Sequence, residues 1–334
     1  MLPPATTLAC LIVLSASLNA QVADDCRQRS AIVNVLDAHG GPVKGLLVND
    51  FRASYRSRPL NVLSLVQRDD PYGRVVVLLD TSGSMSGELD GDSNKWKIAR
   101  AAASEFLRLA PPQQRVSLMT FAGAIGQRFE VSEGRQLMED WLQSKTVIQA
   151  KNVKGRTALY ESILDALKSL NPTRPGDAIY VITDGGENDS RETKARIERA
   201  LRATGVRLFA FLVAGAARRE EEKFGPGDLL ELTRESGGFL LSTSADPFSP
   251  DRFLHRNARF KYDDTVVEGV RSYTRLVRAE ITSFYVLTLQ PPEPSSKTAS
   301  WKLEVVDAGG RSRKGMAAVY PYQLPDCSAL SRPH

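Results

Sequence analysis

The sequence predicts an α/β protein with a doubly wound, mostly parallel sheet, joined to a small β-rich domain formed by the N- and C-terminal flanks. Between residues 74 and 245, continuous apolar runs alternate with stretches of helical spacing, a pattern typical of parallel strands covered by helices on both faces. On either side of this region, short stretches alternate apolar and polar residues between turns, which indicates antiparallel strands.

The first twenty residues are expected to form a signal peptide. They contain no charged side chain, and their apolar core has signal-peptide length but is too short to span a bilayer. Cleavage after Ala20 would send the protein out of the cytoplasm, as a secreted or periplasmic chain. A lipoprotein anchored at Cys10 fits less well, because the apolar core continues past that residue. No other segment is long enough to cross a membrane, so no transmembrane segment is expected in the mature chain.

Removal of the signal peptide leaves two cysteines, Cys26 and Cys327, near the two ends of the chain. In an oxidising compartment this even number suggests one disulfide, and two free thiols remain the alternative. A disulfide would place both termini in the same piece of structure.

The elements follow one another in five regions. After the signal peptide, residues 21–70 form an N-terminal β-rich segment, in which residues 48–66 fold as two strands around a turn at Ser57–Pro59. The α/β core follows over residues 74–245, and a connecting helix is expected within 246–278. The C-terminal β-rich segment, 279–334, contains a hairpin turn at 307–311 and packs against the N-terminal one.

Strands and helices alternate in the core. Its strands are expected at 74–80, 115–122, 127–131, 177–184, 206–215 and 239–243, and its helices at 95–110, 133–145, 157–170, 191–205 and 226–238.

Composition excludes some function classes. The 334 residues carry 44 basic and 39 acidic side chains, a net charge of +5, and the basic clusters are interleaved with glutamate as on solvated helix faces. We therefore expect no nucleic-acid binding. The sequence also lacks a phosphate-binding loop, a dinucleotide fingerprint and a supported nucleophile–histidine set.

Oxygen-bearing side chains follow two of the predicted core strands. The apolar run VVVLL ends in Asp80, Ser82 and Ser84 come next at alternate positions, and Asp184 follows a second strand. Thr157 begins a helix in a third loop. Ligands of open parallel sheets bind outside the carboxyl ends of the strands, where these loops should meet. Carboxylates and hydroxyls without histidine or cysteine suit Mg²⁺, with Mn²⁺ or Ca²⁺ possible.

These residues resemble the metal-ion-dependent adhesion site of the von Willebrand factor type A domain. The family pattern is Asp-x-Ser-x-Ser after the first strand, a threonine in a middle loop and an aspartate after a later strand. Here it is matched by D80-T-S82-G-S84, by T157 and by D184. The resemblance covers roughly residues 74–245, and the flanks look like those of a bacterial secreted group related to this domain.

The resemblance implies a non-enzymatic protein that mediates adhesion or another protein–protein interaction. It assigns the divalent cation to Asp80, Ser82, Ser84, Thr157 and Asp184, and completes the metal shell with an Asp or Glu carboxylate from a partner protein. The acidic loop 87–94 (GELDGDSN), together with Glu187 and Asp189, is expected to make the rim of the site acidic. The alternatives are a metal-dependent hydrolase of the cell envelope, which would need a positioned base, and a structural envelope protein with a vestigial site.

Overall fold

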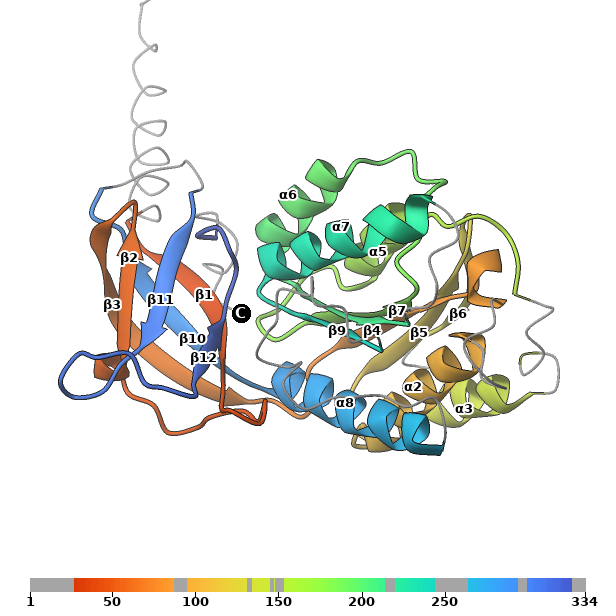
Figure 1. Ribbon diagram of the computed structural model, residues 1–334, viewed down its shortest axis with the longest axis horizontal. Helices are drawn as coiled ribbons and strands as arrows, with labels where there is room; N and C mark the ends of the chain where they lie inside the picture. Colours follow the sequence, from red (N-terminus) through yellow and green to blue (C-terminus); the bar gives the residue numbers. More distant parts are fainter. Residues whose placement is uncertain are drawn as a thin grey trace, which may run out of the picture.

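The computed structural model describes residues 27–86, 95–130, 134–144, 147, 153–213, 220–243, 264–293 and 299–325. The predicted signal peptide, Cys26, Cys327 and the first part of the expected connecting helix lie outside these residues. Within them the chain forms two six-stranded sheets, shown side by side in Figure 1.

The core sheet has the strand order β6-β5-β4-β7-β8-β9. Its strands run parallel, except that β6 pairs antiparallel with β5. All residues of β4, β5, β7 and β8 are buried, as their continuous apolar sequences predict. The strands are β4 (Val75–Asp80), β5 (Val116–Phe121), β6 (Ile125–Phe129), β7 (Ala178–Thr183), β8 (Arg207–Leu212) and β9 (Leu240–Ser242).

Helices cover both faces of this sheet (Figure 1). One face carries α5 (Leu159–Ser169), α6 (Lys194–Thr204) and α7 (Glu220–Ser236), and the other carries α2 (Lys95–Leu109), α3 (Arg135–Gln143) and α8 (Asp264–Thr282). Local signals set their ends. The Thr193 side chain accepts the backbone N–H of Arg196 at the start of α6, and Gly205, with φ of 67°, ends that helix. The predicted doubly wound fold is confirmed.

The second sheet is antiparallel and combines strands from both ends of the chain, in the order β11-β2-β3-β10-β1-β12. A two-residue turn joins β2 to β3, with Arg56 and Ser57 both at positive φ. This sheet confirms the predicted β-rich domain of the two flanks. Its strands are β1 (Arg29–Leu36), β2 (Phe51–Tyr55), β3 (Arg58–Asp69), β10 (Ser283–Gln290), β11 (Trp301–Val305) and β12 (Ala317–Val319).

Strand β1 is buried on both faces, although its sequence suggests alternation between core and solvent. One face contributes to the core of the β-rich domain. On the other face, Ile32 lines a small cavity together with Leu201 and Gly205 at the end of α6, so the α/β core covers this face. Sequence alternation could not reveal this contact, because the covering residues are distant in the chain.

Helix α8 runs directly into β10 and ends at Thr282, beyond the expected boundary at residue 278. Its end is tied to the sheets by Arg207, the first residue of β8, which is fully buried. The Arg207 guanidinium donates to the carbonyls of Glu280 (2.9 Å) and Ile281 (2.8 Å) and to Asn34 Oδ1 of β1 (3.0 Å). Arg207 therefore joins the core sheet, α8 and the β-rich domain at one point.

The charge of Arg207 also compensates a buried carboxyl group. Burial raises the pKa of Glu280 well above its ordinary value, and the nearby Arg207 charge opposes this rise. Burial lowers the pKa of Arg207 to about 10, against the attraction of Glu280 and Asp177. Since removing one member of a buried charged group leaves the other uncompensated, this junction should be sensitive to mutation.

We expect Arg207→Leu to lower the free energy of unfolding by about 3–5 kcal/mol, because three buried acceptors and Glu280 lose their partner. Urea denaturation measures this change. Arg199→Leu, which removes the same charge from an exposed position of α6, should change the stability by less than about 0.5 kcal/mol. Equal stability of both variants would contradict the role given to Arg207.

Candidate metal-binding site

The pairing of β4 with β7 brings the two predicted aspartates to one edge of the core sheet. The strands are parallel, with Leu79 opposite Ile182, so Asp80 lies beside Thr183 and Asp184 follows immediately. The Thr183 hydroxyl donates to Asp80 Oδ2 at 2.6 Å, and the backbone N–H of Ser82 donates to Asp80 Oδ1 at 2.8 Å. Both oxygens of the fully buried Asp80 thus have a donor.

The loop after β4 turns into a short 3₁₀ helix, η2 (Gly83–Ser86), which brings the two predicted serines together. Ser82 Oγ and Ser84 Oγ lie 3.1 Å apart, and Ser84 Oγ donates to Asp184 Oδ1 at 3.2 Å. Gly83 allows this loop to touch the loop before Thr157: its N–H donates to Gly155 O at 2.9 Å, and a Cβ at Gly83 would lie 3.3 Å from that oxygen.

Thr157 belongs to the same site and does not cap α5, whose N-cap residue is Ala158. Its position is seen from Gly186. A Cβ on Gly186 would lie 3.5 Å from Thr157 Oγ1, 3.5 Å from Asp184 Oδ1 and 3.9 Å from Ser84 Oγ. These three oxygens, from three separate loops, therefore lie close to one point beside Gly186.

The donor atoms fit a hard divalent cation. Oxygen ligands at adjacent corners of a Mg²⁺ octahedron are about 3 Å apart, which follows from bond lengths of about 2.1 Å. The spacings of Ser84 Oγ from Ser82 Oγ (3.1 Å) and from Asp184 Oδ1 (3.2 Å) agree with this value. In the described part of the chain, no three His, Cys, Asp or Glu side chains group together as metal ligands.

A lysine outside the predicted set of ligands also reaches the site. Lys95, the first residue of α2, donates from Nζ to Asp184 Oδ2 at 2.7 Å. The exposed fractions of the two side chains are only 7% and 1%. A sequence signal was available, because a cation in the first turn of a helix is unfavourable to the helix dipole. Such a residue is more easily explained when an anion outside its own helix holds it.

The electrostatics of Asp80 differ from those of an ordinary carboxyl group. Burial, and then repulsion from the Asp184 carboxylate, raise the pKa of Asp80 to about 7, from an ordinary value of 3.8. The hydrogen bonds from Thr183 and Ser82 act in the opposite direction. In the absence of a metal, the site is therefore reluctant to hold two negative charges.

Of the residues expected to make the rim acidic, 87–94 lie outside the described residues, and Glu187 and Asp189 have partners nearby. The Glu187 carboxylate turns to the start of α5, where it accepts the N–H of Tyr160 (3.1 Å) and the hydroxyl of Ser190 (2.7 Å). Asp189 Oδ1 lies 3.3 Å from Arg156 Nε. Both acidic groups are thus occupied by local partners, a helix start in one case and an arginine in the other.

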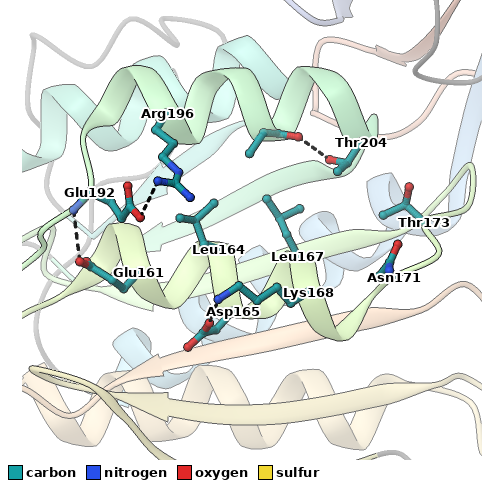
Figure 2. Close-up of a pocket in the computed structure, with 11 residues that line it drawn as sticks. Glu161, Leu164, Asp165, Leu167, Lys168, Asn171, Thr173, Glu192, Arg196 and Thr204 are labelled. Atoms are coloured by element: carbon teal, nitrogen blue, oxygen red, sulfur yellow. Dashed lines mark hydrogen bonds and ion pairs between the residues drawn. The ribbon is translucent and has the colours of Figure 1, made fainter.

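A separate groove of about 590 Å³ lies between α5 and α6 and contains none of the predicted site residues. Leu164 and Leu167 contribute to its apolar part (Figure 2). Its charges pair locally, with Lys168 on Asp165 at 2.7 Å and Arg196 on Glu192 at 3.0 Å. The groove therefore offers no concentrated charge to a ligand.

Two further residues support the site and were not selected from the sequence. Thr183 is the last residue of β7. Its hydroxyl donates to Asp80 Oδ2 and accepts the N–H of Gly185 (3.0 Å). Gly185, at φ of 85°, turns the chain so that a Cβ would lie 3.1 Å from the nitrogen of Pro226 in α7. In the sequence, the threonine before Asp184 and the two glycines after it are the features that could indicate these supporting roles.

Part of the α/β core is similar to a known domain family. Residues 75–187 match the family model of the von Willebrand factor type A domain, a range that contains all five predicted ligands. No curated protein matches the chain in sequence.

Several solved structures are similar to parts of this chain. An aerotolerance-related membrane protein from Bacteroides fragilis, bearing mutations to serine, is 19% identical over 63% of this chain and 98% of its own, with a TM-score of 0.44. BatB from Bacteroides thetaiotaomicron is 18% identical over 62% of this chain and 99% of its own, with a TM-score of 0.42. A von Willebrand factor type A protein from Catenulispora acidiphila is 11% identical over 92% of this chain and 76% of its own, with a TM-score of 0.41.

The raised pKa of Asp80 predicts a pH dependence of stability in EDTA. Between about pH 4 and pH 7, folded Asp80 keeps a proton that the unfolded chain has lost, so its contribution to the free energy of unfolding falls as the pH rises. The full loss is on the order of 2–4 kcal/mol. Urea denaturation between pH 4 and 8 should show a shallower decline for Asp80→Asn than for the wild type. Asp140→Asn, on the exposed side of α3, should follow the wild type. Parallel curves for wild type and Asp80→Asn would contradict the prediction.

Proposed function

Residues 75–187 of this chain belong to the von Willebrand factor type A domain family, and from that premise we propose that the protein binds a divalent cation and uses it to engage a carboxylate on a partner protein. Its role is adhesion or another protein–protein interaction, and it is not an enzyme. Mg²⁺ is the proposed ion, with Mn²⁺ or Ca²⁺ as substitutes.

One observation carries this proposal: oxygens of Ser84, Thr157 and Asp184, from three loops distant in sequence, all lie within 4 Å of the position that a Cβ would take on Gly186. Clusters of buried polar groups are uncommon, because each group loses its hydration on burial and this costs free energy unless another interaction compensates it. A cation that takes these oxygens as ligands would provide such an interaction.

The residues divide into two roles in this proposal. Ser82, Ser84 and Thr157 would supply neutral hydroxyl ligands, and Asp184 would supply charge directly or through water. Asp80, whose oxygens already accept hydrogen bonds from Ser82 and Thr183, would fix the loop and add negative charge. Because few anionic ligands surround it, the bound ion would retain positive charge and attract a carboxylate from outside.

Among the described residues, the loop that presents Thr157 carries exposed positive charge. Lys154 and Arg156, on the loop that presents Thr157, are both exposed. The Arg156 side chain is 68% exposed although it lies near Asp189. A carboxylate that approached along this loop would be attracted by it, and its association rate should then fall as the salt concentration rises.

The site of action proposed for the protein is outside the cytoplasm, either secreted or periplasmic, on the basis of the N-terminal sequence. Among the helices that the structure describes, none combines the length and apolarity needed to cross a membrane.

A disulfide between Cys26 and Cys327 is part of this proposal. Both cysteines lie outside the described residues, but their neighbours lie close together. The Arg29 side chain, which is buried, donates from Nη1 to the carbonyl of Pro325 at 2.7 Å. Cys26 precedes Arg29 by three positions and Cys327 follows Pro325 by two. The two cysteines are therefore each only two or three residues from a pair of groups in direct contact, which favours a disulfide between them.

The metal site is tested by two serines of the same loop. Ser84→Ala should weaken Mg²⁺ binding at least about tenfold, since a ligand is lost. Ser86→Ala should leave it unchanged, because the exposed Ser86 hydroxyl donates to the Gly83 carbonyl within its own loop. Isothermal titration calorimetry measures the affinity, and the rise in melting temperature with Mg²⁺ gives an independent check. Equal Mg²⁺ affinity of Ser84→Ala and wild type would contradict the proposal.

The partner is tested by capture from a native cell envelope on immobilised protein, with Mg²⁺ and with EDTA. The proposal expects a protein retained by wild type and Ser86→Ala in Mg²⁺ but lost with EDTA or with Ser84→Ala. Esterase, peptidase and phosphatase assays of the same variants address the hydrolase alternative. Turnover that requires Mg²⁺ and Ser84 would refute the non-enzymatic proposal.

The disulfide is tested by alkylation of the exported protein followed by mass spectrometry. Neither Cys26 nor Cys327 should react with iodoacetamide in denaturant until a reductant is added, because a disulfide has no thiolate to alkylate. The reduced sample serves as the control. Labelling of both thiols without reductant would show that the bond does not form.

A further inference from the structure

We propose that Lys95 is a built-in competitor of the divalent cation: its ammonium group and the metal share the negative charge of Asp184, so that Lys95 lowers the affinity of the site for metal. This inference rests on the proposed metal function and adds to it a residue that sets the strength of binding.

The geometry of the pair carries the argument. Lys95 Nζ lies 2.7 Å from Asp184 Oδ2, while Ser84 Oγ lies 3.2 Å from the other oxygen, Oδ1. The two oxygens of one carboxylate thus face a lysine on one side and the predicted metal ligands on the other. A metal ion bound at this carboxylate would weaken the attraction between Asp184 and the Lys95 ammonium group. The ammonium group would likewise weaken the attraction between Asp184 and the metal ion.

Burial makes the competition strong. Only 7% of the Lys95 side chain is exposed, and 1% of that of Asp184. An ion pair at a solvated surface contributes little, because water screens it. Away from water, a second cation near the same carboxylate meets repulsion from the ammonium group that solvent does not remove.

The charge balance of the site explains why a lysine is present. Asp80 and Asp184 are buried at the ends of neighbouring strands, where two uncompensated carboxylates would be costly. Lys95 supplies one positive charge to this pair before any metal arrives. Metal loading would therefore exchange one cation for another at Asp184.

Lys95 begins α2, so the exchange reaches beyond the site. The Lys95–Asp184 contact joins the start of α2 to the loop after β7. Once the metal takes the charge of Asp184, this contact weakens and the Lys95 amine becomes more accessible to solvent.

The test compares Mg²⁺ affinity in wild type, Lys95→Met and Lys97→Met by calorimetry. Lys95→Met removes the charge and keeps an unbranched side chain, and it should bind Mg²⁺ at least about tenfold more tightly than wild type. Lys97→Met removes the same charge from an exposed position of the same helical turn and should stay within about twofold of wild type. An affinity of Lys95→Met equal to or weaker than that of wild type overturns the inference.

The outcomes separate this inference from the proposed function. If wild type and Lys95→Met bind Mg²⁺ equally while Ser84→Ala does not, the metal site stands and the competition fails. If Lys95→Met binds Mg²⁺ and wild type does not, the competition is supported in its strongest form. If neither binds, both proposals are refuted.

Lys95→Met leaves Asp184 without its cation and can fail to fold, so a measurement on the wild type decides that case. Acetylation of lysines, followed by mass spectrometry, should modify Lys95 slowly in EDTA and several-fold faster in saturating Mg²⁺. The rate at Lys97 should stay the same in both conditions and serves as the internal control. An unchanged Lys95 rate in a protein that binds Mg²⁺ would overturn the inference.

Discussion

The parallel pairing of β4 with β7 is the constraint on which the site depends. It fixes Asp80 and Asp184 at adjacent strand ends, in a sheet covered by helices on both faces, where little water can solvate them. Two carboxylates in such a place repel each other, and each needs donors or cations nearby. The Thr183 hydroxyl, the Ser82 N–H and the Lys95 ammonium group meet that need within the chain itself.

The same constraint explains why hydroxyl groups predominate around the site. A third or fourth carboxylate would add repulsion that burial intensifies, whereas serine and threonine bring oxygen lone pairs without charge. Asp80 has already committed both of its oxygens to hydrogen bonds. The side chains whose oxygens lie close to Gly186 are therefore mainly neutral, and a cation held there would keep most of its attraction for an external anion.

Packed elements connect this edge of the sheet with the β-rich domain. Lys95 begins α2, and α2 packs against α8 in one hydrophobic cluster. The last turn of α8 accepts hydrogen bonds from Arg207, which also contacts Asn34 of β1. The two domains are thus joined by a buried polar junction at the opposite end of the helix pair, and α8 passes into β10 without a flexible connection.

Local sequence was sufficient for the fold class and for part of the site. Continuous apolar runs such as VVVLL mark buried parallel strands, and alternation with helical stretches leaves few arrangements other than a doubly wound sheet. Strand ends then place Asp80 and Asp184 at one edge. These features depend on residues close together in the chain, whose physical preferences can be judged without tertiary contacts.

Tertiary structure decided what depends on partners distant in sequence. The sequence alone does not show that Lys95 reaches Asp184 or that Glu187 turns toward α5 and leaves the rim, since each choice is made by groups from another element. Burial of both faces of β1 and the junction at Arg207 have the same origin. The sequence by itself therefore determined which strands form and which oxygens stand at their ends, whereas folding determined how those charges are compensated, because electrostatic partners are chosen by distance in space.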